Sequence, residues 1–118
     1  MSSTELQGAY LIDAQLQEAT LDFANLSEAS LEGAQLQRAD LLSADLQRAN
    51  LSGAQLQEAV LSGANLQGAK FTGEFRRSSA PDFSGAKGSS KTVWPDGFDP
   101  EAAGVRMVDE DAGAMEQG

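Results

Sequence analysis

The stretch Ala44-Asp45-Leu46-Gln47-Arg48-Ala49-Asn50-Leu51-Ser52-Gly53 holds two copies of a five-residue unit, and this unit decides the fold. A leucine stands at the centre of the unit, and an alanine stands two residues before it. The same spacing continues without a slip from Thr4 to Gly73, where Thr4 is the only departure from alanine and Phe71 the only departure from leucine. Fourteen consecutive copies therefore cover 70 of the 118 residues.

A period of five fits neither regular element as one straight piece. In an α-helix every fifth residue advances by about 140°, so the leucines would spread around the helix. In a straight strand successive side chains alternate between faces, so an odd period would place successive leucines on opposite sides. All the leucines can point inward if the chain turns a corner once per unit and the units stack on one another.

A longer recurrence gives the length of one coil. The tetrapeptide Ala14–Gln17 returns as Ala34–Gln37 and as Ala54–Gln57, at a spacing of twenty residues. Four units per coil predict a square cross-section and about 3.5 coils over residues 4–73. Stacking at this spacing lines up Gln side chains on one face, which predicts amide ladders between coils. It also brings opposite charges together on neighbouring strands, namely Glu18, Arg38 and Glu58 in one column and Glu28 and Arg48 in another.

The units resemble the motif of the pentapeptide-repeat proteins, in which a small residue is followed by Asp or Asn, then Leu or Phe, then Ser, Thr or Arg. Ala24–Glu28 and Ala49–Gly53 match this motif closely. The resemblance implies an all-β fold, a right-handed quadrilateral β-helix with the central Leu or Phe and the preceding Ala inside. It implies little about activity, because the family is functionally diverse. This sequence often has Gln where Ser, Thr, Asp or Asn is typical, which changes the surface and not the core.

The last position of the unit supplies the corners. Glycine tolerates the positive φ that a type II turn requires, so the glycine copies predict type II turns. Other copies have Glu, Arg, Asp, Ser or Phe at this position, which predicts that type I turns are mixed in. The glycine copies are Gly8, Gly33, Gly53, Gly63, Gly68 and Gly73.

The repeat pattern stops after Gly73. We expect residues 74–100 to form a loop, a partial repeat that resumes at Phe83–Lys87, and a cap over the last coil, whose edge and core leucines need a cover. Trp94 and Phe98 are the candidate C-terminal cap, and a binding anchor is the alternative role. This segment is similar to the one that follows the repeats in several bacterial, notably cyanobacterial, members. Residues 101–118 are predicted to be an acidic tail, with a short helix over Glu101–Val108 or disorder.

Composition excludes several classes of function. The formal net charge is −10 and the chain contains neither His nor Cys. No positive stripe is available for nucleic acid, so we expect no nucleic-acid partner. We also expect no catalytic residues, no cofactor and no metal site, because the acidic pairs follow no known ligand spacing. The N-terminus lacks a signal peptide and any apolar run that could span a bilayer, which predicts a cytoplasmic protein with no membrane partner.

Outward apolar residues are the remaining candidates for function. Phe23, Leu42 and Val60 fall on one predicted face in successive coils and form the candidate partner surface, while Tyr10 and Ile12 lie outward on another face. The alternative is that these are single exposed apolar residues without a binding role, since such residues are common on protein surfaces. The expected function is a non-catalytic structural or protein-interaction module that presents flat faces to an unknown protein partner.

Two further possibilities follow from the resemblance and from the chain ends. Some family members mimic DNA and inhibit or protect a DNA-binding enzyme such as gyrase. The acidic charge agrees with this alternative, but a rod of about 17 Å is half of one DNA turn of about 34 Å. Only five residues precede Leu6, so a homodimer through the N-terminal coil end is also expected as a possibility.

Overall fold

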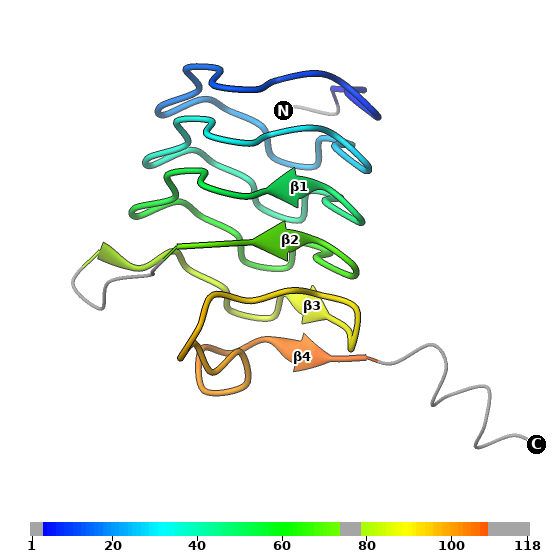
Figure 1. Ribbon diagram of the computed structural model, residues 1–118, viewed down its shortest axis with the longest axis vertical. Coiled ribbons are helices and arrows are strands. Elements are labelled where there is room, and N and C mark those ends of the chain that lie inside the picture. Colours follow the sequence, from blue (N-terminus) through cyan, green and yellow to red (C-terminus); the bar gives the residue numbers. More distant parts are fainter. Residues whose placement is uncertain (1–3, 74–78, 109–118) are drawn as a thin grey trace, which may run out of the picture.

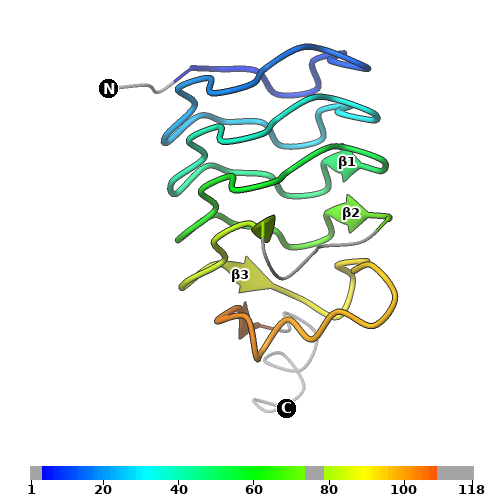
Figure 2. The same ribbon diagram turned by 90° about the vertical axis from the view of Figure 1, so that its left-hand side faces the viewer.

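The fold is a right-handed quadrilateral β-helix, as expected from the repeat (Figures 1 and 2). A computed structural model of the chain describes residues 4–73 and 79–108. The coils stack along one axis, with the first coil at one end of the stack and the last strand at the other. None of the described residues belongs to a helix that is long and apolar enough to cross a membrane.

The strands are short because the chain turns a corner every five residues. The named strands are β1 (Asn50–Leu51), β2 (Lys70–Phe71), β3 (Lys87–Gly88) and β4 (Arg106–Met107). β1 pairs in parallel with β2, and β3 pairs in parallel with β4. Through the rest of the repeat region, isolated parallel bridges join residues twenty apart, such as Gln15 and Gln35. This register confirms the predicted coil length.

Backbone hydrogen bonds are satisfied around each unit in two ways. At the corner, the Ala29 N–H donates to the Leu26 carbonyl over 3.1 Å, which closes a turn. Between coils, the Leu26 N–H donates to the Asp45 carbonyl over 2.7 Å. Because both bonds recur in nearly every unit, stacked coils pair their buried backbone without long strands.

The core is a column of leucines lined by alanines. The central leucines from Leu26 to Leu66 are at most 4% exposed, and Phe71 and Phe83 are as deeply buried. In the first coil, by contrast, Leu6, Leu11 and Leu16 are only partly buried against this core. Among the described residues, the inner coils are therefore covered on both sides, whereas the coil of residues 4–23 is covered by a neighbouring coil on one side.

Every corner of the repeat region has the same backbone conformation. Eight non-glycine residues, among them Phe23 and Arg38, have φ between 54° and 61° at the last position of the unit, and the glycines there are also at positive φ. Positive φ at the third residue of a turn is the signature of type II and excludes type I. The prediction of mixed type I turns was therefore wrong. The N–H at this position donates to the coil below, so every corner must present it in the same direction.

The coiled path continues beyond the last clean repeat. Asp82 pairs with Val60, Lys87 with Asn65, and Val93 with Lys70. The separation has grown from twenty residues to 22 and then to 23. The core continues across this longer spacing, because Phe83 and Ala86 return to the buried positions of Phe or Leu and of Ala.

The predicted short helix over residues 101–108 was wrong. The segment ends in β4, where the Arg106 N–H donates to the Ala86 carbonyl and the Val108 N–H to the Gly88 carbonyl, both over 2.7 Å. The open edge of β3 offers these acceptors, and an isolated helix of this length would be marginal. The disorder expected for the end of the tail concerns residues 109–118, which lie outside the described residues.

Candidate functional site

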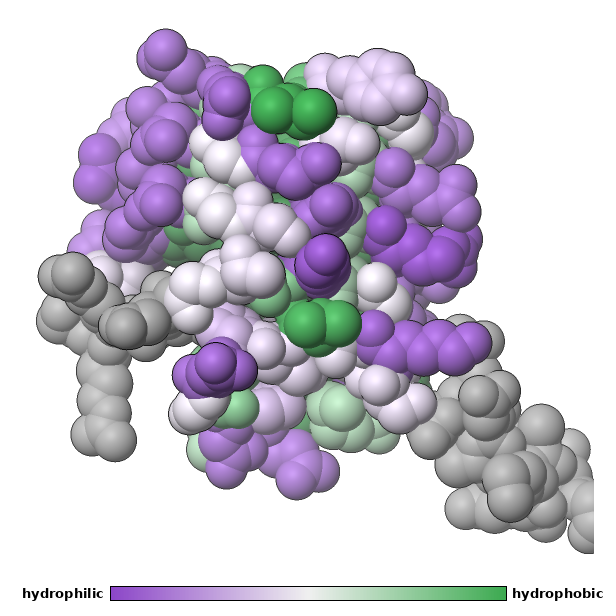
Figure 3. All heavy atoms as spheres, viewed as in Figure 1, coloured by the Kyte–Doolittle hydropathy of each residue, from purple (hydrophilic) through white to green (hydrophobic). Residues whose placement is uncertain are grey.

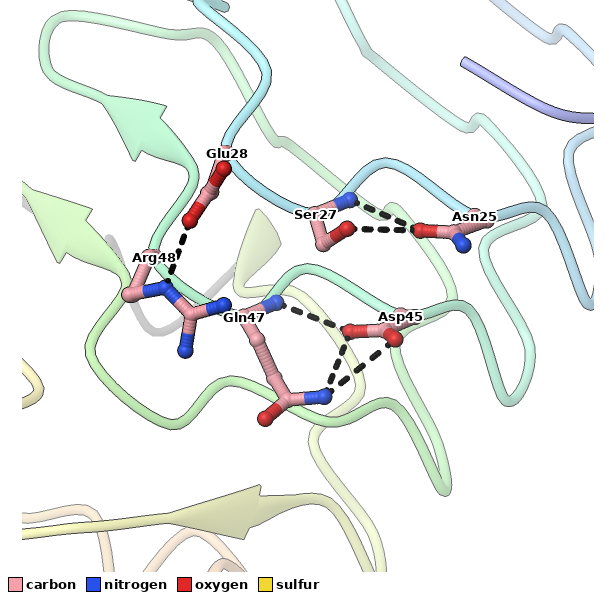
Figure 4. Close-up of polar contacts among 6 residues, drawn as sticks. All are labelled: Asn25, Ser27, Glu28, Asp45, Gln47 and Arg48. Atoms are coloured by element: carbon pink, nitrogen blue, oxygen red, sulfur yellow. Dashed lines mark hydrogen bonds and ion pairs between the residues drawn. The ribbon is translucent and has the colours of Figure 1, made fainter. Parts of the chain in front are cut away.

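The outer side chains of a unit bond to each other within that unit. Asp45 accepts hydrogen bonds from the Gln47 N–H and from the Gln47 side-chain amide, both over 3.1 Å, and the Ser27 hydroxyl donates to Asn25 over 2.8 Å (Figure 4). An acceptor just before the leucine and a donor just after it lie two residues apart on the same face. This pairing gives the physical reason for Asp or Asn before the leucine. It recurs at Asn50–Ser52, Asn65–Gln67 and Asp82–Ser84.

The Gln face follows the same rule, so the predicted amide ladder was wrong for the described residues. The Gln37 amide donates to Gln35 over 2.8 Å, and the Gln57 amide donates to Gln55 over the same distance. These bonds run along the chain within one unit and not between coils. Gln35 and Gln55 lie on the same face as the Gln two residues later. Each accepts a hydrogen bond from the side-chain amide that a ladder between coils would use.

Two predicted ion pairs are confirmed at the corners. Arg38 lies 2.9 Å from Glu18, and Arg48 lies 3.0 Å from Glu28, as Figure 4 shows for the second pair. Arg38 turns toward Glu18, and within the described residues Glu58 has no ion-pair partner. Because all four side chains are well exposed, each pair contributes well under about 1 kcal/mol.

The three residues of the candidate partner surface have unequal exposure. Phe23 is 52% exposed, Leu42 is 37% exposed, and Val60 is partly buried. The Phe23 N–H donates to the Leu42 carbonyl over 2.8 Å, which places these two on adjacent coils. Val60 pairs with Asp40 on the next coil, so polar residues separate it from the other two. The three residues as one partner surface stay a prediction.

The exposed large apolar residues are spread over the described structure, with Tyr10, Ile12 and Phe23 on the first coil, Leu42 on the second, and Val93 and Met107 near the C-terminal end. Tyr10 is 86% exposed, Ile12 is 54% exposed, and Phe23 lies in the same coil. On the side that carries β1 and β2, hydrophobic residues show as isolated spots among hydrophilic ones, and one such spot lies at the N-terminal end (Figure 3). Counting outward apolar residues by coil would have found the three on the first coil from the sequence.

The opposite end of the helix is lined by aromatic rings. Trp94 stacks on Phe71 with ring centres 5.3 Å apart and an angle of 6° between the planes. The Phe98 ring lies 5.2 Å from Trp94 and 5.4 Å from Phe83. Trp94 and Phe98 are both partly buried against the core. Their role as a cap stays a prediction, to which these contacts give a geometric basis.

Trp94 occupies space that a leucine fills elsewhere. Gly88 stands at the central position of its unit, and a Cβ built there would lie 3.0 Å from Cζ2 of Trp94 and 3.1 Å from Cγ1 of Val105. The missing side chain thus leaves room for the indole ring and for Val105. The sequence signal was the glycine in a leucine position, two residues after the buried Ala86.

The side-chain carboxyl group of Asp82 has a pKa below its ordinary value. The Ser84 hydroxyl donates to Asp82 over 2.6 Å and the Ser84 N–H over 3.0 Å, and these bonds lower the pKa of Asp82. A lowered pKa in the folded state means that the associated stability is present above the unfolded pKa and is lost as the pH falls through the folded one.

We expect Ser84→Ala to raise the pKa of Asp82 toward its ordinary value, because the substitution removes the side-chain hydrogen bond, which is the largest cause of the shift. NMR titration of the Asp82 carboxyl measures this change. Ser62→Ala removes a hydroxyl from the same column without touching Asp82 and serves as the control. An unchanged Asp82 pKa in Ser84→Ala would contradict the assignment.

Among the described residues, no three Asp, Glu, His or Cys side chains are grouped so that they could hold a metal ion. What the described surface offers chemically is a frame of locally paired polar groups with a few exposed apolar side chains, of which Tyr10 is the most exposed.

Comparison with known proteins identifies the family. The model of the family described as pentapeptide repeats (8 copies) matches residues 4–41 and 39–73. The chain is similar in structure to HetL, a pentapeptide repeat protein involved in heterocyst differentiation regulation from the cyanobacterium Nostoc, with 27% identity and a TM-score of 0.56 over 75% of this chain and 48% of HetL. It therefore spans about half the length of HetL.

Two other solved structures share more sequence with the chain. The pentapeptide repeat protein alr5209 from Nostoc is 30% identical over 88% of this chain and 84% of its own, with a TM-score of 0.43. Rfr23 from the cyanobacterium Cyanothece is 34% identical over 80% of this chain and 63% of its own, with a TM-score of 0.44. No curated protein sequence gives a significant match. Since the family model covers more than half of the sequence, the chain belongs to the pentapeptide-repeat proteins.

Proposed function

We propose that this protein is a non-catalytic, cytoplasmic interaction module, a rigid β-helix that presents apolar side chains to another protein. The observation that carries the proposal is the strong exposure of Tyr10 and Ile12, two residues apart on one side of the first coil, with Phe23 exposed in the same coil. Large exposed apolar side chains that gather in one region mark interaction sites more often than scattered ones do. HetL, to which the chain is similar in structure, is involved in the regulation of heterocyst differentiation.

Rigidity supports binding by this surface. The first coil is held to the second by backbone hydrogen bonds, such as those from the Leu11 N–H to the Ser30 carbonyl and from the Leu16 N–H to the Gln35 carbonyl, both over 2.7 Å. A partner therefore meets side chains on an ordered frame and loses little conformational entropy in binding them. The corner ion pairs are well exposed and too weak to organise a site.

A pull-down with two variants tests the proposal. We expect Tyr10→Ser/Ile12→Ser to reduce recovery of the native partner at least tenfold, since both side chains are exposed and their loss leaves the core intact. Phe23→Ser/Leu42→Ser tests the predicted face in the same way, and Gln17→Ser/Gln57→Ser is a polar control. Equal recovery with both apolar variants would remove the proposal.

A DNA mimic acting on an enzyme such as gyrase is the alternative, and the net charge of −10 is the observation in its favour. In a gyrase supercoiling assay, we expect no inhibition or protection at stoichiometric concentration. Inhibition that survives Tyr10→Ser/Ile12→Ser but is lost when surface carboxylates become amides would establish the alternative.

A further inference from the structure

We propose that the N-terminal end of the β-helix docks a protein whose surface has an apolar centre edged by Lys or Arg side chains. This inference rests on the proposed interaction role and adds to it the location of the surface and the chemistry of the partner. The docking surface, called the N-terminal end below, consists of the apolar residues Leu6, Tyr10, Leu11, Ile12, Leu16 and Phe23 with the carboxylates of the same coil.

The apolar part of this surface is the open end of the core. Leu6, Leu11 and Leu16 occupy the same inward positions as leucines that are fully buried in later coils, yet they are only partly buried. A coil stacked on this end would cover them as each later coil is covered. Tyr10 and Ile12 extend the apolar area around one side of the end.

The backbone at this end is also open to a partner. Within the described residues, the N–H and C=O groups of Glu5, Tyr10 and Gln15 have no backbone hydrogen-bond partner, whereas the equivalent groups of Asn25, Ser30 and Gln35 are paired. An exposed edge of this kind accepts an added strand. In the part of the chain that the structure describes, these three edges lie on three successive sides of the first coil.

The negative charge of the first coil favours a partner with basic side chains. Residues 4–23 contain four acidic side chains and neither Lys nor Arg. Glu18 is paired with Arg38, which leaves Glu5, Asp13 and Asp22 without an ion-pair partner among the described residues. A partner with basic side chains around an apolar centre would pair with these carboxylates, and it would associate faster because opposite charges attract over about 10 Å at moderate salt.

The same charges disfavour a second copy of this chain as the occupant. In a symmetric dimer the same patch meets itself, so the carboxylates of one copy would face those of the other. Like charges brought together at an interface oppose binding strongly at low salt. A homodimer through the N-terminal coil end is thus the competing outcome, and it would require screening of these carboxylates.

A charge-reversed copy of the protein serves as a probe with the required chemistry. In Glu5→Lys/Asp13→Lys the apolar residues of the N-terminal end stay unchanged, and the two most exposed unpaired carboxylates become basic. We expect wild type and this variant to form a one-to-one complex at low salt in analytical ultracentrifugation, while neither associates alone. The dissociation constant should rise at least tenfold between about 0.05 M and 0.5 M NaCl, because the attraction is screened.

Two controls keep the result specific. Glu58→Lys/Glu101→Lys makes the same change of charge far from the N-terminal end and should form no complex with wild type. Tyr10→Ser/Ile12→Ser in the wild-type component should weaken the complex at least tenfold, and circular dichroism checks that every variant is folded. If the mixed complex does not form, this inference is wrong, whereas the general interaction role is judged separately by the pull-down. Dimerisation of wild type alone at low salt overturns it in favour of a second copy.

Discussion

Leu46→Ala is expected to lower the free energy of unfolding by about 3 to 5 kcal/mol, which is a large part of the about 5 to 15 kcal/mol that stabilises a typical domain. Leu46 is fully buried and lies in a column of leucines between the coils above and below. The backbone of both coils is held by hydrogen bonds, so the stack cannot close around the missing side chain. The cavity therefore remains and adds to the lost transfer free energy. Chemical denaturation followed by circular dichroism measures the change.

Leu6→Ala is the matched control for this prediction. Leu6 stands at the same position of its unit and on the same side of the coil, but it lies in the open first coil and is only partly buried. We expect its loss to cost about 1 kcal/mol, because less apolar area is returned to water and no closed cavity forms. Equal effects of the two substitutions would show that the first coil is covered in solution, as a partner or a dimer would cover it.

Gly88→Leu should destabilise the protein by about 2 to 3 kcal/mol even though it restores the repeat motif. From the sequence alone, leucine at this central position is the expected residue. In the structure, Cζ2 of Trp94 and Sδ of Met107 lie 3.0 Å and 3.2 Å from the position of the added Cβ, so a leucine side chain would displace the indole ring. Overpacking of a filled core costs energy of this size. Thermal unfolding and Trp94 fluorescence measure the effect.

A double-mutant cycle with Trp94→Ala separates overpacking from other causes. When the indole ring is removed, the space beside residue 88 becomes free, so Gly88→Leu should cost less than it does in the presence of Trp94. Gly88→Ala adds only the Cβ and should have an intermediate effect. If Gly88→Leu stabilises the protein in the presence of Trp94, then the indole does not occupy the leucine position.

The described structure confirms the predictions that depend on the period of the sequence. The central leucines, the preceding alanines and the twenty-residue register follow from spacing alone, and so do the ion pairs of Arg38 and Arg48. The predictions of amide ladders between coils and of mixed turn types were wrong, because both depend on local geometry that the period does not fix. Gln37 bonds along its own unit, and the corner at Phe23 adopts positive φ although phenylalanine disfavours it.

Among the candidate sites, the exposure of Phe23 and Leu42 could be predicted from their positions in the unit. The presence of Tyr10, Ile12 and Phe23 on one coil could also be read from the sequence, but only by comparing coils and not faces. Whether a leucine is buried depends on the coils above and below it. Leu6 and Leu46 occupy equivalent positions in the sequence, yet only the stack of coils leaves the first partly exposed and buries the second.

By itself, the sequence determined the architecture, because a five-residue period with leucine and alanine at set positions buries its apolar side chains only in a square, stacked coil. The tertiary structure alone decided how the stack ends. Past Gly73 the spacing grows, Trp94 enters the position that Gly88 leaves empty, and Arg106–Met107 pairs with β3 as a strand. These contacts join residues without a periodic relation, and their energy comes from packing and edge pairing that no local pattern encodes.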